Sequence, residues 1–215
     1  MKPSVFLASV CALLAFACSP ADSAKSDKAQ TTKPQNQYEI AGDIGMGDPK
    51  APVVLLEYAS VTCVHCAHFH EEILPELKTQ YIDTGKVRYV MREFPTQPVP
   101  IAVAGFMTAR CAGPDKYYAV IDGLMRAQRT IMSSSSPRTE LLKIAKQSGL
   151  TEAEFNACIT DEAGLDRIQA SINSGVETYK ISATPSFVVN GETISNVRTL
   201  EDLTKVIDPL LAEDE

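Results

Sequence analysis

An apolar run that leads directly into a pair of cysteines constrains the fold of this chain more than any other feature. The segment "PVVLLEYAS" is nearly continuously apolar from Val53 to Tyr58, as in a strand that is covered on both faces. The segment "TCVHC" follows, and the next residues have apolar side chains at helical spacing, from Phe69 to Tyr81. We therefore expect Cys63 at the N-terminus of a helix that follows a buried strand.

The residues up to Phe94 predict a strand–helix–strand unit. Pro75 lies inside the helical pattern and should kink the helix rather than end it, whereas Gly85 is a typical stop. The segment "KVRYVMREF" has the composition of a second strand. Because the connections are short, we expect the two strands to be parallel with a right-handed crossover.

The second half of the chain predicts a helical block, a strand hairpin and a last helix. The pattern is helical from Val99 to about Lys180, and a capping box at Thr151–Glu154 opens the helix that contains Cys158. A tight turn at Asn190-Gly191 joins two short strands, and Thr199–Leu211 closes the chain as a helix. This order predicts a thioredoxin-like α/β fold with an inserted α-helical domain at about residues 98–180.

The first 37 residues predict export and attachment to a membrane. Residues 1–17 combine a lysine with an apolar stretch that is too short to span a membrane, as in a secretory signal peptide. The small residue Ala17 precedes Cys18, which we expect to be the lipidated first residue of a mature lipoprotein. An ordinary secretory peptide that is cut nearby is the alternative. Residues 18–37 lack large apolar side chains and predict a disordered tether. We expect a periplasmic protein with a lipid anchor.

Residues 38–215 have the size of one domain with its own core. Four of the 20 basic residues and two of the 27 acidic residues lie before residue 38, so the domain has 16 basic and 25 acidic residues and a net charge of −9. This charge argues against nucleic acid as a partner.

Four of the six cysteines lie in this domain, and an even number in an oxidising compartment predicts two disulfides. Cys63 and Cys66 are too close to be bridged elsewhere, which leaves Cys111 and Cys158 as the second pair. A Cys111–Cys158 bridge would close a long loop and, in the chain-entropy model, would stabilise the fold by about 4 kcal/mol. Two buried free thiols are the alternative.

The Cys63–Cys66 motif has the features of a redox pair. At a helix N-terminus, unpaired N–H groups and the helix dipole favour a thiolate at Cys63, and His65 adds a donor or a positive charge. Cys66, further into the helix, is then the resolving thiol. The alternative is a metal site made of Cys63, Cys66 and His70, but a second ligand pair is absent from the sequence. We expect His68 and His70 to be solvated and no metal or cofactor to be bound.

Two residues outside this motif are further candidates. Glu57 lies in the apolar strand six positions before Cys63, where a buried carboxylate could relay the proton of Cys66. The alternative is a carboxylate that turns to water at the strand end. Pro185 follows Thr184 just before the third strand of the expected sheet, which is the position of a cis-proline loop.

The segments "EYASVTCVHCAHFH" and "TPSFVVNG", with the helical block between them, resemble the DsbA family of periplasmic thiol:disulfide oxidoreductases. The resemblance implies Cys63 as attacking thiol, Cys66 as resolving thiol, His65 as tuning residue and Glu57 as buried acid. It also implies that Thr184-Pro185 holds the substrate backbone, and that a membrane quinone-linked reductase reoxidises the pair. Family members often have Pro where this chain has Val64, and this dipeptide helps to set the potential.

We therefore expect an enzyme that introduces disulfides into unfolded exported proteins. A membrane-tethered reductase or isomerase is the alternative in the same fold, although Ser19–Gln37 is too short and polar for the dimerisation domain that isomerases use. A copper-binding chaperone that uses Cys63, Cys66 and a histidine, and a scaffold lipoprotein with an inert disulfide, are hypotheses of other classes.

Overall fold

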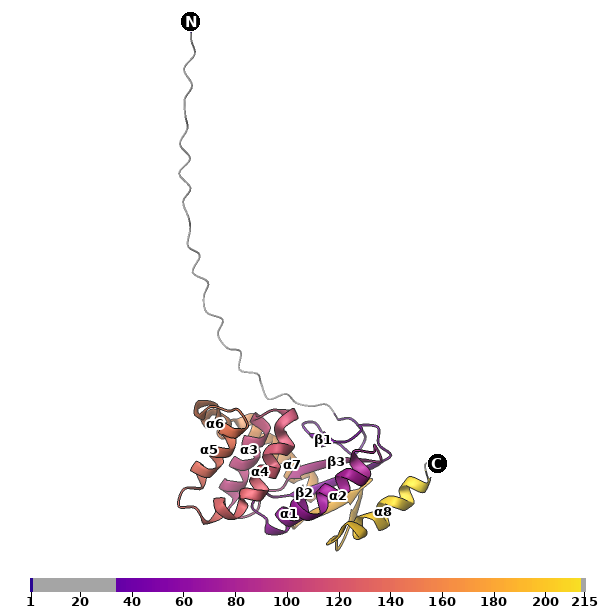
Figure 1. Ribbon diagram of the computed structural model, residues 1–215. Coiled ribbons are helices and arrows are strands. Elements are labelled where there is room, and N and C mark those ends of the chain that lie inside the picture. Colours follow the sequence, from indigo (N-terminus) through magenta and orange to yellow (C-terminus); the bar gives the residue numbers. More distant parts are fainter. Residues whose placement is uncertain (2–33, 214–215) are drawn as a thin grey trace.

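Strand β2 lies at the centre of a five-stranded sheet (Figure 1). The computed structural model describes residue 1 and residues 34–213. The strand order is β1-β3-β2-β4-β5, in which β2 is parallel to β3 and antiparallel to β4. The predicted parallel unit and the hairpin are both confirmed; the two-residue β1 was not predicted, because it is too short to show a period. The strands are β1 (Gly45–Met46), β2 (Val53–Ala59), β3 (Val87–Glu93), β4 (Ser186–Val189) and β5 (Glu192–Ile194).

The helix after β2 continues past Pro75, as predicted. Its segments are α1 (Val64–His68), the π-helical η1 (Phe69–Ile73), α2 (Leu74–Leu77) and the π-helical η2 (Lys78–Ile82). Because proline has no N–H to donate, the π-helical turn just before Pro75 is a local adjustment of the hydrogen-bond ladder. Gly85, with φ of +76°, follows the end of the helix and allows the chain to turn into β3.

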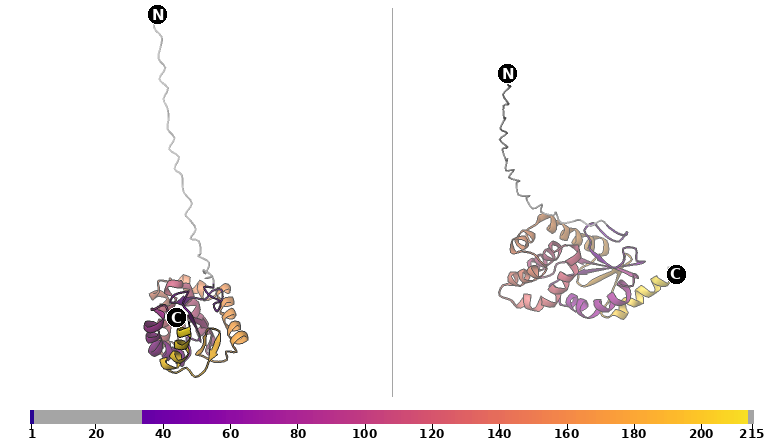
Figure 2. Two further views of the ribbon diagram at one scale, coloured as in Figure 1. Left: turned by 90° about the vertical axis from the view of Figure 1, so that its right-hand side faces the viewer. Right: turned by 45° about the horizontal axis from the view of Figure 1, so that its top comes forward.

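The helical insertion lies between β3 and β4 and packs beside the sheet, whereas α8 lies at the opposite end of the molecule (Figures 1 and 2). The capping box predicted at the start of α6 is present. None of the described helices is long and apolar enough to cross a membrane. The helices are α3 (Val99–Cys111), α4 (Pro114–Ser133), α5 (Pro137–Gln147), α6 (Glu152–Cys158), α7 (Glu162–Asn173), η3 (Ser174–Thr178) and α8 (Leu200–Glu213).

The two faces of β2 contact two different hydrophobic cores, so all seven of its residues are buried, as the apolar run predicted. Leu55 and Ala59 belong to the larger core, which includes residues of the helices, and Leu56 belongs to a smaller core on the other face. Because side chains alternate along a strand, Glu57 lies on the same face as Leu55 and Ala59. Its carboxylate is therefore on the side of the larger core, which also contains Cys66.

Candidate active site

Cys63 lies at the N-terminal cap of α1, directly after the loop that follows β2. Its backbone is extended, with φ of −90° and ψ of 119°, and its carbonyl oxygen accepts the first helical hydrogen bond from Ala67 at 3.1 Å. Cys63 is partly exposed, whereas Cys66 is fully buried one turn into the helix. Both thiols are free, so the structure shows the reduced form of the pair. The predicted position of Cys63 is confirmed.

The surroundings of Cys63 lower its pKa from 9.0 to about 5. The largest cause is a hydrogen bond from the Cys66 side chain to the Cys63 sulfur, and it outweighs the partial burial of Cys63. The Thr184 side chain and the backbone N–H groups of Cys66 and His65 lower the pKa further. These groups stabilise a thiolate that is still partly accessible to a substrate.

Cys66 is shifted in the opposite direction. Burial raises the pKa of the Cys66 thiol well above 9.0, and the interaction with Cys63 and the negative charge of Glu57 raise it further. The N–H group of Ser60 lies 3.5 Å from the Cys66 sulfur and opposes this shift. Between about pH 5 and 9 the reduced pair therefore consists of a thiolate at Cys63 and a protonated thiol at Cys66.

The Thr184–Pro185 peptide bond is cis, as the position of Pro185 predicted. Its loop lies beside the active thiol: the carbonyl oxygen of Thr184 is 3.3 Å from the Cys63 sulfur, although the two residues are 121 positions apart. The Gln97–Pro98 bond is also cis, which the sequence did not indicate. The His65 side chain is exposed at the start of α1.

Glu57 is fully buried, which excludes the alternative of a carboxylate that turns to water. Its Oε2 atom accepts a hydrogen bond from the hydroxyl of Tyr89 on β3 and lies 3.1 Å from Nε2 of His70. We expected His70 to be solvated, and this prediction is wrong: His70 is only 4% exposed, because it lies on the helix face that packs against the sheet. His68 is exposed, as expected.

One carboxylate oxygen of Glu57 has no partner. Within the described part of the chain, no group donates a hydrogen bond to Glu57 Oε1, although this atom is buried. A buried acceptor without a partner is costly. Glu57 is therefore held from one side by His70 and Tyr89, and its other oxygen is free to accept a proton or a water molecule.

The loop between β2 and α1 is fixed by residues that the sequence analysis did not single out. Gln128, in α4, donates hydrogen bonds from Nε2 to the carbonyl oxygens of Val61 at 2.9 Å and Cys63 at 3.0 Å. The Thr62 hydroxyl is 2.9 Å from the Ser60 hydroxyl and 3.0 Å from the carbonyl oxygen of Thr96, in the loop after β3. Nothing local in the sequence marks Gln128, because its partners lie more than 60 positions away.

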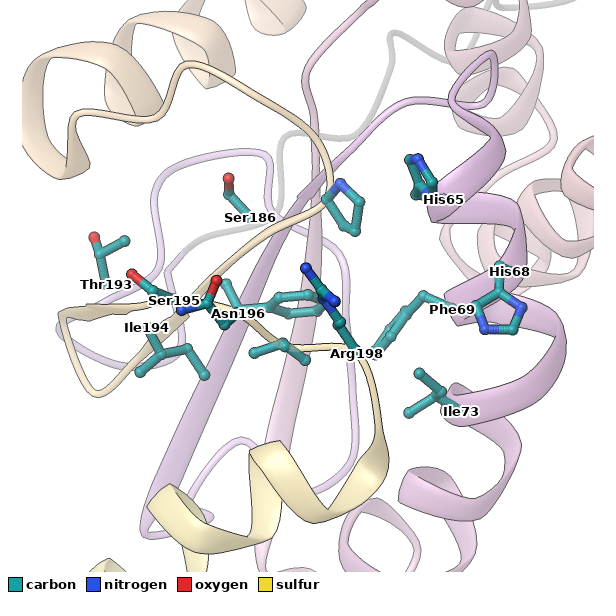
Figure 3. A pocket seen from close by; sticks show the side chains of 13 residues that line it. His65, His68, Phe69, Ile73, Ser186, Thr193, Ile194, Ser195, Asn196 and Arg198 are labelled. Atoms are coloured by element: carbon teal, nitrogen blue, oxygen red, sulfur yellow. The ribbon is translucent and has the colours of Figure 1, made fainter.

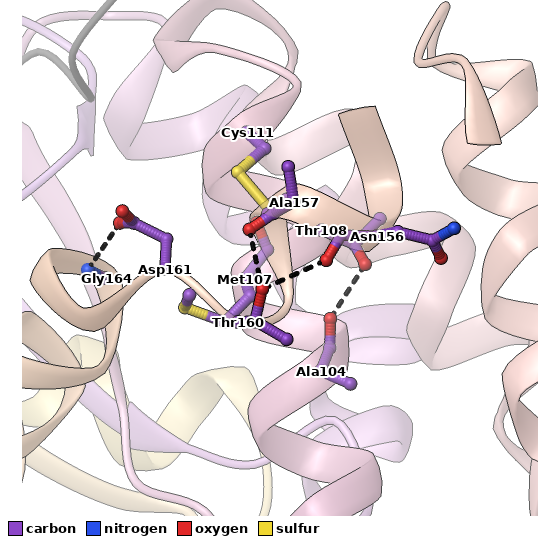
Figure 4. The surroundings of a disulfide bond; sticks show 10 residues. Ala104, Met107, Thr108, Cys111, Asn156, Ala157, Thr160, Asp161 and Gly164 are labelled. Atoms are coloured by element: carbon purple, nitrogen blue, oxygen red, sulfur yellow. Dashed lines mark hydrogen bonds between the residues drawn. A yellow bond between two sulfur atoms is a disulfide. The ribbon is translucent and has the colours of Figure 1, made fainter. Parts of the chain in front are cut away.

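The Cys111–Cys158 bridge predicted from the cysteine count is present (Figure 4). It joins the last residue of α3 to the last residue of α6, with the two Cα atoms 6.2 Å apart. The bridge therefore ties two helices of the insertion together and excludes the alternative of two free thiols.

The metal hypothesis combined Cys63, Cys66 and His70. In residues 34–213, no group of three or more His, Cys, Asp or Glu side chains is arranged to hold a metal ion. The imidazole of His70 is instead engaged with Glu57 and lies 3.4 Å from the Tyr89 hydroxyl.

A groove of about 700 Å³ opens beside the cis-proline loop (Figure 3). His65 and Phe69 line it from the helix side, Pro185 and Phe187 from the proline loop and β4, and residues 193–198 from β5 and the segment before α8. The groove therefore starts next to the active-site helix and extends along the surface of the sheet.

Comparisons with known proteins agree with this geometry. A family model described as Thioredoxin matches residues 39–209. A protein-disulfide oxidoreductase of Rickettsia prowazekii is 31% identical over 195 residues, which cover 90% of this chain and 71% of the relative. The crystal structure of Wolbachia pipientis alpha-DsbA1 has a TM-score of 0.74 and 30% identity, and the match covers 81% of this chain and 94% of that one. The chain belongs to the DsbA-like thiol:disulfide oxidoreductases.

Other matches of this DsbA-like chain are more partial or more distant. A protein-disulfide oxidoreductase of Rickettsia bellii is 33% identical over 172 residues, and the match spans 80% of this chain but 65% of that relative. Oxidised BdbD of Bacillus subtilis has a TM-score of 0.70 at 20% identity, which shows the shared fold alone. The predicted DsbA-like fold with its helical insertion is thus confirmed. Residues 2–17 of the predicted signal peptide, Cys18 and most of the predicted tether lie outside the described residues.

Proposed function

We propose that this DsbA-like protein is a disulfide oxidase that donates a Cys63–Cys66 disulfide to exported proteins while they fold. One observation carries the proposal: the pKa of Cys63 is lowered to about 5 and that of Cys66 is raised above 9.0. A stabilised thiolate favours the reduced pair, so the corresponding disulfide is a strong oxidant. A low cysteine pKa and a high potential are known properties of this family.

The reaction consists of two thiol–disulfide exchanges. A substrate thiolate attacks the sulfur of Cys63, the bond between the cysteines breaks, and Cys66 leaves as a thiolate that takes up a proton. The second substrate thiolate then attacks the substrate sulfur of the mixed disulfide, and Cys63 leaves as a thiolate. Two electrons pass from the substrate dithiol to the cysteine pair. One substrate proton ends on Cys66 and the other goes to solvent.

Three further residues have proposed roles in these steps. The Thr184-Pro185 loop lies beside Cys63, where the backbone of an extended substrate can be held. His65 contributes a backbone N–H that stabilises the leaving thiolate at Cys63. Glu57, with its free Oε1 atom and its influence on Cys66, is placed to exchange the proton that Cys66 takes up.

The cycle needs a second reaction that restores the disulfide. The reduced pair must transfer two electrons and two protons to an oxidant, for which we propose a membrane quinone-linked reoxidase of the DsbB type. A periplasmic location with a lipid anchor on Cys18 would keep the domain near such a partner, and the predicted signal sequence supports this.

The test is the reduction potential of the Cys63–Cys66 pair in the full chain, measured by equilibration with glutathione while the Cys111–Cys158 bridge stays intact. We expect a value well above the roughly −270 mV of thioredoxin and toward the roughly −120 mV of DsbA. A value near or below that of thioredoxin would instead assign the protein as a tethered reductase. The control is Cys66→Ala, which removes the resolving thiol and should accumulate mixed disulfides with substrate.

A further inference from the structure

The groove beside the active site combines an apolar floor with positively charged and donor groups (Figure 3). Phe69 and Phe187 form the floor, with their ring centroids 4.8 Å apart, and Ile73 extends it along the helix. The opposite wall includes the segment 195–198, which leads from β5 toward α8. An apolar side chain placed on this floor would be removed from water, which is favourable at about 25 cal/mol per Å².

The groove lining contains a cation, the Arg198 guanidinium, and no anion. Its lining includes Arg198, His65 and His68 but none of the acidic residues of a domain with a net charge of −9. Figure 3 shows the Arg198 side chain extending over the groove near Phe69. Within the groove, an acidic side chain would therefore meet a cation and no carboxylate.

The Arg198 guanidinium is available to a ligand. Arg198 is exposed, and among residues 34–213 no side chain forms an ion pair with it. The nearest carboxylate in sequence, that of Asp202, accepts hydrogen bonds from the backbone N–H groups of Arg198 and Thr199 and from the Thr199 hydroxyl. Asp202 is therefore committed to the start of α8.

We propose that Arg198 is a selector for acidic side chains: of the extended substrate segments that can lie in the groove, it favours those in which an acidic side chain lies next to an apolar one. The apolar side chain would lie on Phe69 and Phe187, and the carboxylate would accept hydrogen bonds from the Arg198 guanidinium. This inference rests on the proposed oxidase function and narrows its substrate class. Arg198 is thus a specificity-determining residue that takes no part in the thiol–disulfide exchange.

The expected size of the selectivity follows from the exposure of the site. An exposed ion pair contributes little, so a Glu in the substrate should increase the rate by about 1.4- to 5-fold over Gln. The rate advantage of the Glu peptide should decrease at high salt, because salt screens both the long-range attraction to Arg198 and the ion pair itself. A Lys at the same place should slow the reaction by a similar factor.

The experiment uses the full chain in its oxidised form and three peptides that differ at one position. Each peptide contains two cysteines and one Phe, and the residue next to Phe is Glu, Gln or Lys, placed in turn on either side. Second-order rates of peptide oxidation are measured at low and high salt. We expect the order Glu, Gln, Lys for the natural chain, a loss of the preference in Arg198→Ala, and its reversal in Arg198→Glu.

The matched control is Lys50→Ala, which also removes one exposed positive charge. Lys50 lies before β2, at the end of the sheet opposite to Cys63, so this variant should retain the preference for Glu. Using the ratio of the Glu and Lys rates within each variant cancels differences in folding or active fraction. Equal rates for the three peptides, or a ratio that Arg198→Ala leaves unchanged, would overturn the proposal.

Oxidation of dithiothreitol, a small uncharged dithiol, separates this inference from the proposed function. If the natural chain oxidises dithiothreitol but shows no peptide preference, the groove proposal fails and the oxidase function stands. If the natural chain oxidises neither dithiothreitol nor any peptide, the oxidase function itself fails.

Discussion

Gln128 donates a hydrogen bond of 3.0 Å to the carbonyl oxygen of Cys63, so a helix of the insertion directly holds the loop of the active thiol. The same Nε2 atom donates to the carbonyl oxygen of Val61 at 2.9 Å. The insertion is therefore part of the active-site scaffold, because it orients the residue from which α1 starts.

Replacing Gln128 by Met should destabilise the protein and the active-site loop. The buried carbonyl oxygen of Val61 would lose its Gln128 donor, which costs about 1–3 kcal/mol of the free energy of unfolding, whereas the carbonyl oxygen of Cys63 keeps the N–H of Ala67. Chemical denaturation of the reduced protein measures this loss. Gln147→Met, at an exposed position of α5, is the matched control and should change the free energy of unfolding by less than about 0.5 kcal/mol. Equal effects of both variants would contradict the anchoring role.

The lowered pKa of Cys63 makes the stability of the reduced form depend on pH. A thiol with a folded pKa of about 5 and an ordinary pKa of 9.0 contributes stability that is present above the ordinary value and is lost as the pH falls through about 5. We therefore expect the free energy of unfolding of the reduced form to increase, relative to that of the oxidised form, as the pH rises from about 5 to 9. Denaturant unfolding of both forms across this window tests the sign; a difference that grows toward acid pH would be incompatible with it.

The hydrogen bond from Cys66 is the largest cause of the low Cys63 pKa. Cys66→Ala should therefore raise the pKa of Cys63, because the sulfur loses a donor, whereas Cys66→Ser should raise it less, because the hydroxyl can still donate. Thiolate absorbance as a function of pH measures the midpoint. An unchanged midpoint in Cys66→Ala would show that the backbone N–H groups at the helix N-terminus are sufficient.

The charge of Glu57 should act on Cys66. Glu57→Gln keeps the side-chain shape but removes the negative charge that contributes to the raised pKa of Cys66, so this pKa should fall. The pH dependence of Cys66 alkylation, in a Cys63→Ala background, measures the shift. Glu72→Gln, at an exposed position of the helix that contains Cys66, is the control. If both variants gave the same Cys66 profile, Glu57 would have no electrostatic role.

Removal of the Cys111–Cys158 bridge should destabilise the fold. Replacing both cysteines by Ala should reduce the free energy of unfolding by about 2–5 kcal/mol, because the unfolded chain gains freedom. Thermal or denaturant unfolding in the oxidised state measures the loss. The control is Cys63→Ala, which leaves the bridge intact and should retain most of the stability; an unchanged midpoint in the double variant would show that the bridge is not a brace.

Much of the fold follows from local patterns. The apolar run before the cysteines specifies a strand that is buried on both faces, and the helical spacing after them places Cys63 at a helix N-terminus. The capping box specifies the start of α6, and the Asn190-Gly191 turn specifies the hairpin of β4 and β5. The cysteine count predicts the Cys111–Cys158 bridge. These features depend on residues close together in the sequence, or on a count, so they are readable without the tertiary structure.

Contacts between distant residues were decided only by the tertiary structure. His68 and His70 are two positions apart on one helix, and both fit its pattern as polar residues. Packing of this helix against the sheet turns His70 toward Glu57, 13 positions earlier, and leaves His68 in solvent. The contact of Gln128 with the Cys63 carbonyl oxygen and that of the Thr184 carbonyl oxygen with the Cys63 sulfur also join residues that are far apart in the sequence. The sequence thus determined the chemistry of the cysteine pair, whereas the partners that orient it depend on how helices and strands pack, which no local spacing encodes.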